Sequence, residues 1–178
     1  MHQNVESILI SQQKLEKTVK SLAKQIEKDY NGKEFIMVGL LKGSVVFMSD
    51  LMKQIDLDFE IDFMVASSYG GGTESSGKVK IIKDLGVDPR DKDLLIVEDV
   101  VDSGNTLNFV INHLMTNGAR SVKVCTLCDK PSRRKVPLTP DYCGAEIPDE
   151  FIVGYGLDYD ELYRNLPYIG VLKRSVYE

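Results

Sequence analysis

The stretch that decides the fold is DLLIVEDVVDSGNTL, residues 93–107. Its apolar run, LLIV, is typical of a strand that is buried on both faces of a parallel sheet. Two carboxylates, Glu98 and Asp99, follow this run directly, and a third, Asp102, comes three residues later. The small polar residues after Asp102 indicate a turn that leads into a helix. We therefore predict a strand, an acidic turn and a helix start in direct succession.

Strand and helix patterns alternate along the chain without a linker or an internal repeat, which predicts one α/β domain with a mostly parallel sheet. The expected strands are 35–41, 59–66, 78–82, 93–100 and 121–128, and the expected helices are 5–26, 45–55 and 107–115. Ligands of such sheets bind beyond the carboxyl ends of the strands. The residues of interest are therefore 41–44, 98–106 and 129–130.

The composition, 178 residues with 43% hydrophobic and 28% charged, is that of one soluble globular domain. The longest apolar run, FIMVGLL at 35–41, is far shorter than the ~20 residues that cross a bilayer. The first residues lack the basic and apolar regions of a signal peptide. We therefore expect neither a membrane protein nor a secreted one.

The formal net charge of −5 argues against a nucleic-acid partner, because such binding neutralises a row of phosphates. One phosphorylated small molecule remains compatible, since a few backbone amides can hold a phosphate. Three cysteines, an odd number, fit a reducing cytoplasm. Cys125 and Cys128 have the spacing of a redox or zinc pair, but they lie in a predicted strand. Positions three apart in a strand point to opposite faces, so we expect two small buried hydrophobic residues.

The acidic turn has two interpretations. Carboxylates accept hydrogen bonds from ribose hydroxyls and helix starts bind phosphate, so the turn suits a ligand with a phosphate, a diol and a nearby metal. An acidic turn before an ordinary Ser/Thr helix cap is the alternative, and it is the better one for an arbitrary turn of this composition. The order of residues decides between them.

The segment VEDVVDSGNTL, 97–107, resembles the phosphoribosyl-diphosphate (PRPP) motif of type I phosphoribosyltransferases, in which an apolar strand precedes two acidic residues and a small-residue turn ending in Thr. The chain contains no P-loop, and GGGTESSG at 70–77 lacks the context of a dinucleotide-binding motif. Further segments in the matching order are similar to the bacterial type of the hypoxanthine-guanine phosphoribosyltransferase family. These segments are 40–51, 67–85, 127–136 and 148–172.

The resemblance implies the type I phosphoribosyltransferase fold, a mostly parallel twisted sheet flanked by helices with a small hood formed by the C-terminal segment. Within a single domain, 1–178, we expect a core at about 35–128. The purine-binding hood is expected at about 129–172, together with part of the N-terminal segment.

The resemblance also implies how PRPP is held. Glu98 and Asp99 would bind the ribose 2′- and 3′-hydroxyls, directly or through Mg²⁺. The 5′-phosphate would bind the turn made of Ser103, Gly104, Asn105 and Thr106.

The diphosphate would receive main-chain donors from Lys42 and Gly43 and a contact from Arg164. The loop that matches Lys42 commonly contains a non-proline cis peptide. Asp158 matches a second Mg²⁺ site, reached through waters, so two Mg²⁺ ions are expected per active site.

Ser68 and Tyr69 match the loop that closes over bound substrates in this family. The composition of 67–77, with four Gly, four Ser and one Thr, independently indicates a segment with almost nothing to bury. Closure of such a loop would exclude water from the reacting ribosyl centre.

The purine site is implied on the C-terminal side. Lys130 would contact the exocyclic O6, Phe151 would stack on the ring, and the main chain of Ile152 would recognise the N1 and N2 edge. The basic residues beside Lys130 are expected to face solvent or another subunit rather than substrate. They are Arg133, Arg134 and Lys135.

The implied reaction is displacement of diphosphate from C1 of PRPP by N9 of a 6-oxopurine, giving IMP or GMP, with Asp102 as the proton acceptor. An acid at this position fits hypoxanthine or guanine better than adenine or orotate, whereas a preference for xanthine remains an open alternative.

A ligand-sensing regulator is the rival class of function, but the acidic net charge argues against it. The expected partners are PRPP, the base and further copies of the chain, as a dimer or tetramer.

Overall fold

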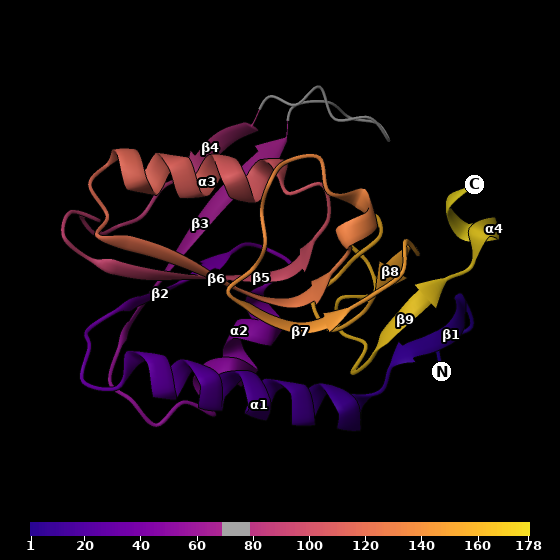
Figure 1. The fold of residues 1–178 in the computed structure, drawn as a ribbon. Coiled ribbons are helices and arrows are strands. Elements are labelled where there is room, and N and C mark those ends of the chain that lie inside the picture. The colour runs from indigo at the N-terminus through magenta and orange to yellow at the C-terminus, as the bar shows by residue number, and fades with distance from the viewer. Residues whose placement is uncertain (69–78) are drawn as a thin grey trace.

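The computed structural model describes residues 1–68 and 79–178. Six strands form the larger sheet, in the order β4-β3-β2-β5-β6-β7 (Figure 1). They are β2 (Ile36–Leu40), β3 (Glu60–Ser68), β4 (Val79–Lys83), β5 (Asp93–Val101), β6 (Ser121–Asp129) and β7 (Tyr142–Glu146). All neighbouring pairs are parallel except β3 with β4. The predicted α/β class with a mostly parallel sheet is confirmed.

Helices cover both faces of this sheet (Figure 1): α1 (Gln12–Tyr30) and α2 (Val45–Met52) lie on one face, and α3 (Asn105–Thr116) lies on the other. Successive side chains of a strand point to opposite faces, so each central strand contributes to two cores. In β5, Leu95 and Val97 belong to the core shared with α1 and α2, whereas Leu94 and Ile96 pack with α3. This two-sided burial explains the uninterrupted apolar run in the sequence.

A small antiparallel sheet forms the hood beside the larger one. Its order is β1-β9-β8, with β1 at Val5–Ile10, β8 at Ile152–Val153 and β9 at Ile169–Leu172. A final turn of helix, α4 (Arg174–Tyr177), follows β9. Both ends of the chain therefore lie at the hood, as Figure 1 shows.

The expected helix over residues 5–26 is wrong in its first third. Residues Val5–Ile10 form β1, and α1 begins only at Gln12, where Ser11 accepts a hydrogen bond from the Lys14 N–H at 3.4 Å. Apolar residues at 5, 8 and 9 fit a helical period, but Val5 pairs with Leu172 at the other end of the chain. The periodicity of apolar residues reflects only nearby positions, so it cannot reveal a strand partner this far along the chain.

The carboxyl ends of β2, β5 and β6 lie at one edge of the sheet because these strands are parallel neighbours. β7 falls in the range expected for the hood but pairs with β6 in the larger sheet, so the hood is built from β1, β8, β9 and their connections. Cys125 and Cys128 are fully buried, as predicted. Among the described residues, no helix is long and apolar enough to cross a membrane.

Candidate active site

The end of β5 presents two adjacent carboxylates, a buried Asp99 and a partly buried Glu98. Asp99 is 8% exposed, and its burial raises the pKa of this carboxyl to about 6. Burial and the neighbouring charge of Asp99 raise the pKa of Glu98 well above its usual range. Oε2 of Glu98 is buried and has no hydrogen-bond partner among the described residues. Burying a carboxylate oxygen without a partner is costly, so this pair has the character of a ligand site rather than of a structural core.

The turn after β2 lies directly against these carboxylates. A Cβ on Gly43 would overlap the carboxylate of Asp99, so only glycine fits here. From the hood side, Gly156 approaches the carbonyl of Gly43 equally closely and has a φ of +102°, a conformation that favours glycine. The peptide bond between Leu41 and Lys42 is cis. Two loops and the end of β5 therefore meet with no side chain between them.

The start of α3 is open toward the same edge of the sheet. The residue that precedes the helix is Gly104, with a φ of +79°, and it has no side chain to cap the helix. A hollow of about 160 Å³ lies beside it and is lined by Glu98, Asp102, Ser103 and Thr106, among others. Free N–H groups and the positive end of the helix dipole favour an anion at this position.

Arg164 lies in the connection between β8 and β9 and joins a cluster of charges. Its Nη2 is 3.0 Å from Oδ1 of Asp158 and 3.1 Å from Oε2 of Glu161. The same Glu161 oxygen lies 3.1 Å from Nζ of Lys42. The charge of Arg164 also reaches Asp99, whose pKa it lowers against the larger effect of burial. The predicted diphosphate contacts Lys42 and Arg164 are thus linked through one carboxylate.

Lys130 is buried at the end of β6, between the sheet and the hood. Its backbone N–H donates to Val101, and its Nζ donates to the carbonyl of Glu150 at 2.7 Å. Because Leu172 donates to the carbonyl of Phe151, the backbone groups of the next residue, Ile152, point away from β9. β8 is an edge strand, so this side of it has no strand partner in the described part of the chain.

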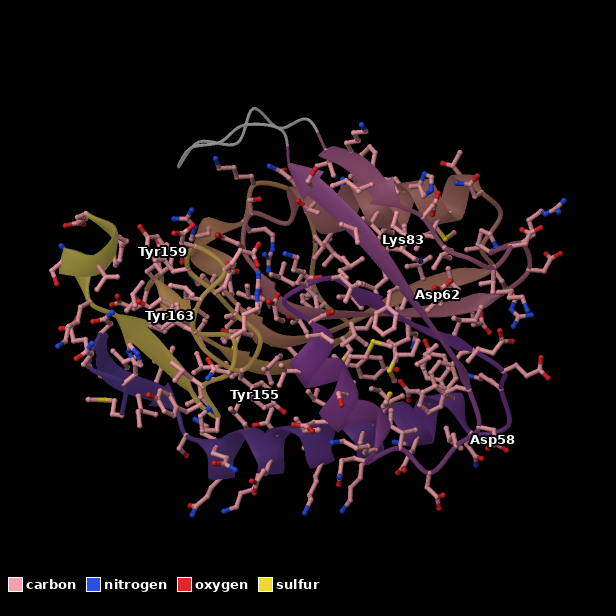
Figure 2. The ribbon with its side chains drawn as sticks, turned by 180° about the vertical axis from the view of Figure 1, so that it is seen from behind. Asp58, Asp62, Lys83, Tyr155, Tyr159 and Tyr163 are labelled. Carbon is pink, nitrogen blue, oxygen red and sulfur yellow. The ribbon has the colours of Figure 1, made fainter. Side chains whose placement is uncertain are left out.

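Phe151 is 38% exposed and belongs to an aromatic cluster in the hood. Its ring stacks on Tyr177 of α4, with centroids 4.7 Å apart and planes at 22°, and Tyr159 meets it edge-on at 5.5 Å. Figure 2 shows Tyr159 and Tyr163 in the hood, away from Asp62 and Lys83 on the outer strands of the sheet. Phe151 is therefore supported by other rings and still partly open.

Asp102 follows β5 and accepts a hydrogen bond from Nε of Arg133 at 2.5 Å. Nη1 of Arg133 also lies 3.3 Å from the carboxylate of Asp149. Arg134 is mostly buried, where it donates to Asp129 and to the backbone carbonyl of Asp102. The expectation that these residues face solvent or another subunit is therefore wrong for Arg134, which ion pairs and backbone carbonyls enclose. Arg133 is exposed, as expected, although it also pairs with Asp102 and Asp149. Lys135 is exposed, as expected.

The predicted metal ligands are only partly brought together. Among residues 1–68 and 79–178, no three His, Cys, Asp or Glu residues are grouped to hold a metal ion, so Asp158 does not complete a ligand set with Glu98 and Asp99. Mg²⁺ usually takes one or two carboxylates plus waters and substrate oxygens. The adjacent carboxylates and the unpartnered Oε2 of Glu98 fit that pattern. Of the predicted closing loop, Ser68 ends β3, and Tyr69 lies outside the described residues.

Sequence reasoning missed two residues of the site. Glu161 lies within the matching segment 148–172, but the resemblance implied no role for this residue, and its φ of +64° has no signal in the sequence. Tyr177 lies beyond Leu172, where the family resemblance ends. The basic cluster at Arg133 was visible as a signal, but its carboxylate partners are distant in the sequence.

Comparison with known proteins agrees with this geometry. Residues 5–160 match the family described as phosphoribosyl transferase domain. A hypoxanthine-guanine phosphoribosyltransferase of Staphylococcus aureus is 52% identical over 177 residues, which cover 99% of each chain. A crystal structure of a hypoxanthine phosphoribosyltransferase from S. aureus has a TM-score of 0.96 at 52% identity and covers 100% of this chain and 97% of that one. A hypoxanthine-guanine phosphoribosyltransferase structure from Bacillus anthracis has a TM-score of 0.90 at 50% identity, covering 95% and 99%.

Proposed function

The chain belongs to the hypoxanthine-guanine phosphoribosyltransferase family, and on this premise we propose how its residues divide the work of the reaction. The enzyme transfers the 5-phosphoribosyl group of PRPP to N9 of hypoxanthine or guanine, giving IMP or GMP and diphosphate. This is a purine-salvage reaction. One observation carries the assignment of roles: the carboxylate of Glu98 with its unpartnered Oε2, a helix start preceded by glycine and a buried lysine lie at one edge of the sheet.

PRPP binds along this edge. Its 5′-phosphate accepts hydrogen bonds from the turn Ser103–Thr106, where the dipole of α3 adds to the attraction. Its ribose hydroxyls donate to Glu98 and Asp99. The diphosphate lies between the turn at Lys42 and Gly43 and the guanidinium of Arg164. The glycine at residue 43 supports this arrangement, since it brings the backbone of the turn against the Asp99 carboxylate with no side chain in between.

The purine binds between the core and the hood. The Lys130 ammonium has three donors, one of which is used by Glu150, so others are free to donate to the purine O6. Phe151 stacks on the ring with the face that Tyr177 leaves open. The outward backbone groups of Ile152 bind the N1 and C2 edge.

The chemistry is a displacement at C1 of the ribose. Positive charge develops on the sugar and negative charge on the departing diphosphate, which Lys42, Gly43 and Arg164 stabilise. Asp102 accepts the purine proton, at N7, as N9 attacks.

Mg²⁺ is the cofactor we assign to the carboxylate pair. Glu98 and Asp99 would hold it, with Asp158 contributing to a second ion through waters. When bound, Mg²⁺ neutralises charge on the leaving diphosphate.

The assembly and location of the enzyme complete the proposal. A dimer or tetramer is supported by exposed apolar side chains at Val45 and Leu162, beside the diphosphate residues. Sedimentation or light scattering at several concentrations would test it.

A cytoplasmic location is supported by the three free thiols, Cys125, Cys128 and Cys143. Fractionation of the source cells would test it.

A four-base kinetic panel at fixed PRPP and Mg²⁺ tests the purine site. The Lys130 ammonium would face the 6-amino group of adenine donor to donor, and an unsatisfied buried donor costs ~1–3 kcal/mol or more. The main chain near Ile152 is expected to accept at C2, where xanthine has a second oxygen. We therefore expect kcat/KM to be highest for hypoxanthine and guanine, well lower for xanthine and negligible for adenine. Efficient use of adenine would exclude the role of Lys130.

A further inference from the structure

The short turn after Lys130, η1 (Pro131–Arg133), reaches two parts of the active site. At its start, Lys130 donates to the carbonyl of Glu150 in the hood. At its end, Arg133 donates from Nε to Oδ1 of Asp102 at 2.5 Å. One turn of chain thus contacts both the purine-binding segment and the residue assigned as proton acceptor.

Arg133 makes a second contact that completes a bridge. Its Nη1 lies 3.4 Å from Oδ1 and 3.3 Å from Oδ2 of Asp149, two residues before Phe151. A planar guanidinium holds both carboxylates in a defined direction, which a flexible ammonium would not do. Asp102 follows the central strand β5, whereas Asp149 belongs to the hood. β6 joins the two regions through the backbone, since Asp129 pairs with Val101 of β5 and with Glu146 of β7, and Arg133 adds a direct side-chain link between the two carboxylates.

We propose that Arg133 is a positioning residue, which sets the proton acceptor Asp102 at a fixed distance from the purine-binding segment 149–152. The proposal rests on the function assigned to Asp102 above. Arg133 uses Oδ1 of Asp102 and leaves Oδ2 for the purine proton. A guanidinium stays protonated, so Arg133 cannot replace Asp102 as the base.

The exposure of the bridge separates this role from a structural one. The side chains of Arg133 and Asp102 are 45% and 44% exposed, and ion pairs of such exposure contribute little to folding stability. A base displaced by about 1 Å can nevertheless slow a reaction on the order of 10²-fold. Loss of Arg133 should therefore affect turnover and leave folding unchanged.

The first test compares single variants. Arg133→Gln is expected to lower kcat about tenfold, with KM for PRPP and the melting temperature close to those of the wild type. Arg133→Lys keeps the positive charge but not the planar guanidinium, so its kcat should lie between those of Arg133→Gln and the wild type. Arg120→Gln is the control, because Arg120 is an arginine of similar exposure that pairs with Asp93 away from the site, and its kcat should not change.

The second test is a double-mutant cycle with Asp102→Asn. If Arg133 acts through Asp102, adding Arg133→Gln to Asp102→Asn should lower kcat less than twofold further. A tenfold loss in both backgrounds would overturn the proposal, as would wild-type turnover of Arg133→Gln beside a slow Asp102→Asn. Fast turnover of Asp102→Asn would instead show that the proton acceptor itself is misassigned, and the proposal for Arg133 would fall with it.

Discussion

A single side chain, Asp102, takes the purine proton in the proposed reaction. Asp102→Asn keeps its shape but removes the base, so kcat should fall about 10²-fold or more while PRPP binding stays nearly intact. Steady-state kinetics with hypoxanthine, together with calorimetric titration of PRPP, would measure both quantities. Turnover within about threefold of the wild type would contradict the assignment.

The carboxylate pair at Glu98 and Asp99 should contribute to the binding of PRPP and not to the binding of the purine base. The double variant Glu98→Gln, Asp99→Asn removes the charges that hold the ribose and Mg²⁺, and it leaves Lys130 and the hood intact. We expect PRPP affinity in Mg²⁺ to fall at least tenfold, with little change in affinity for the free purine. Calorimetric titration would measure both affinities. An unchanged affinity for PRPP would contradict the assignment of Glu98 and Asp99 to PRPP and Mg²⁺.

At the scale of elements, an ion pair joins the starts of β5 and β6. Hydrogen bonds from Arg120 hold the pKa of Asp93 below its usual range, and Ser121 donates to the same carboxylate at 2.6 Å. A depressed pKa in the folded state contributes stability above the unfolded pKa of ~3.9, and this stability is lost as the pH falls through the lower folded pKa. Asp93→Asn should therefore cost about 1–2 kcal/mol at pH 7.

The pH dependence of that cost is the sharper test. The difference in the free energy of unfolding between wild type and Asp93→Asn should be constant from about pH 7 to 5 and shrink below about pH 4. Urea unfolding across this range would measure it. Asp91→Asn, which removes a nearby charge outside these hydrogen bonds, should show no such change. A difference that is as large at pH 3 as at pH 7 would contradict the assigned cause.

The sequence correctly predicted the strands whose burial shows in the pattern of their own apolar residues. The apolar runs of β2, β5 and β6 predict strands because both faces of these strands are covered. β1 was mistaken for helix because its pairing partner, β9, is remote. The same limit applied to Arg133: its charge was visible, but its carboxylate partners come from other loops. The order of the motifs predicted the residues that bind PRPP. No motif predicted that Tyr177 would stack on Phe151.

At the scale of the whole molecule, the hood depends on the packing of the first strand against the last. Val5 is almost fully buried and lies against Gly170. Val5→Ala should cost roughly 1.5–3 kcal/mol and loosen the hood, so KM for hypoxanthine should rise more than KM for PRPP. Ile8→Ala, in the same strand but 46% exposed, is the control and should change neither constant. Equal changes in both KM values for Val5→Ala would contradict a hood specific for the base.

The pairing of Val5 with Leu172 has a consequence for synthesis of the chain in the cell. Ribosomes add ~5–20 residues per second, so β1 waits roughly ten seconds or longer before β9 has been made. During this interval β1 is an unpaired strand edge, the kind of surface that chaperones and aggregating neighbours recognise. The nascent chain can assemble β2, β5 and β6 while translation continues, but the sheet that supports the purine site is complete only after β9 has been made.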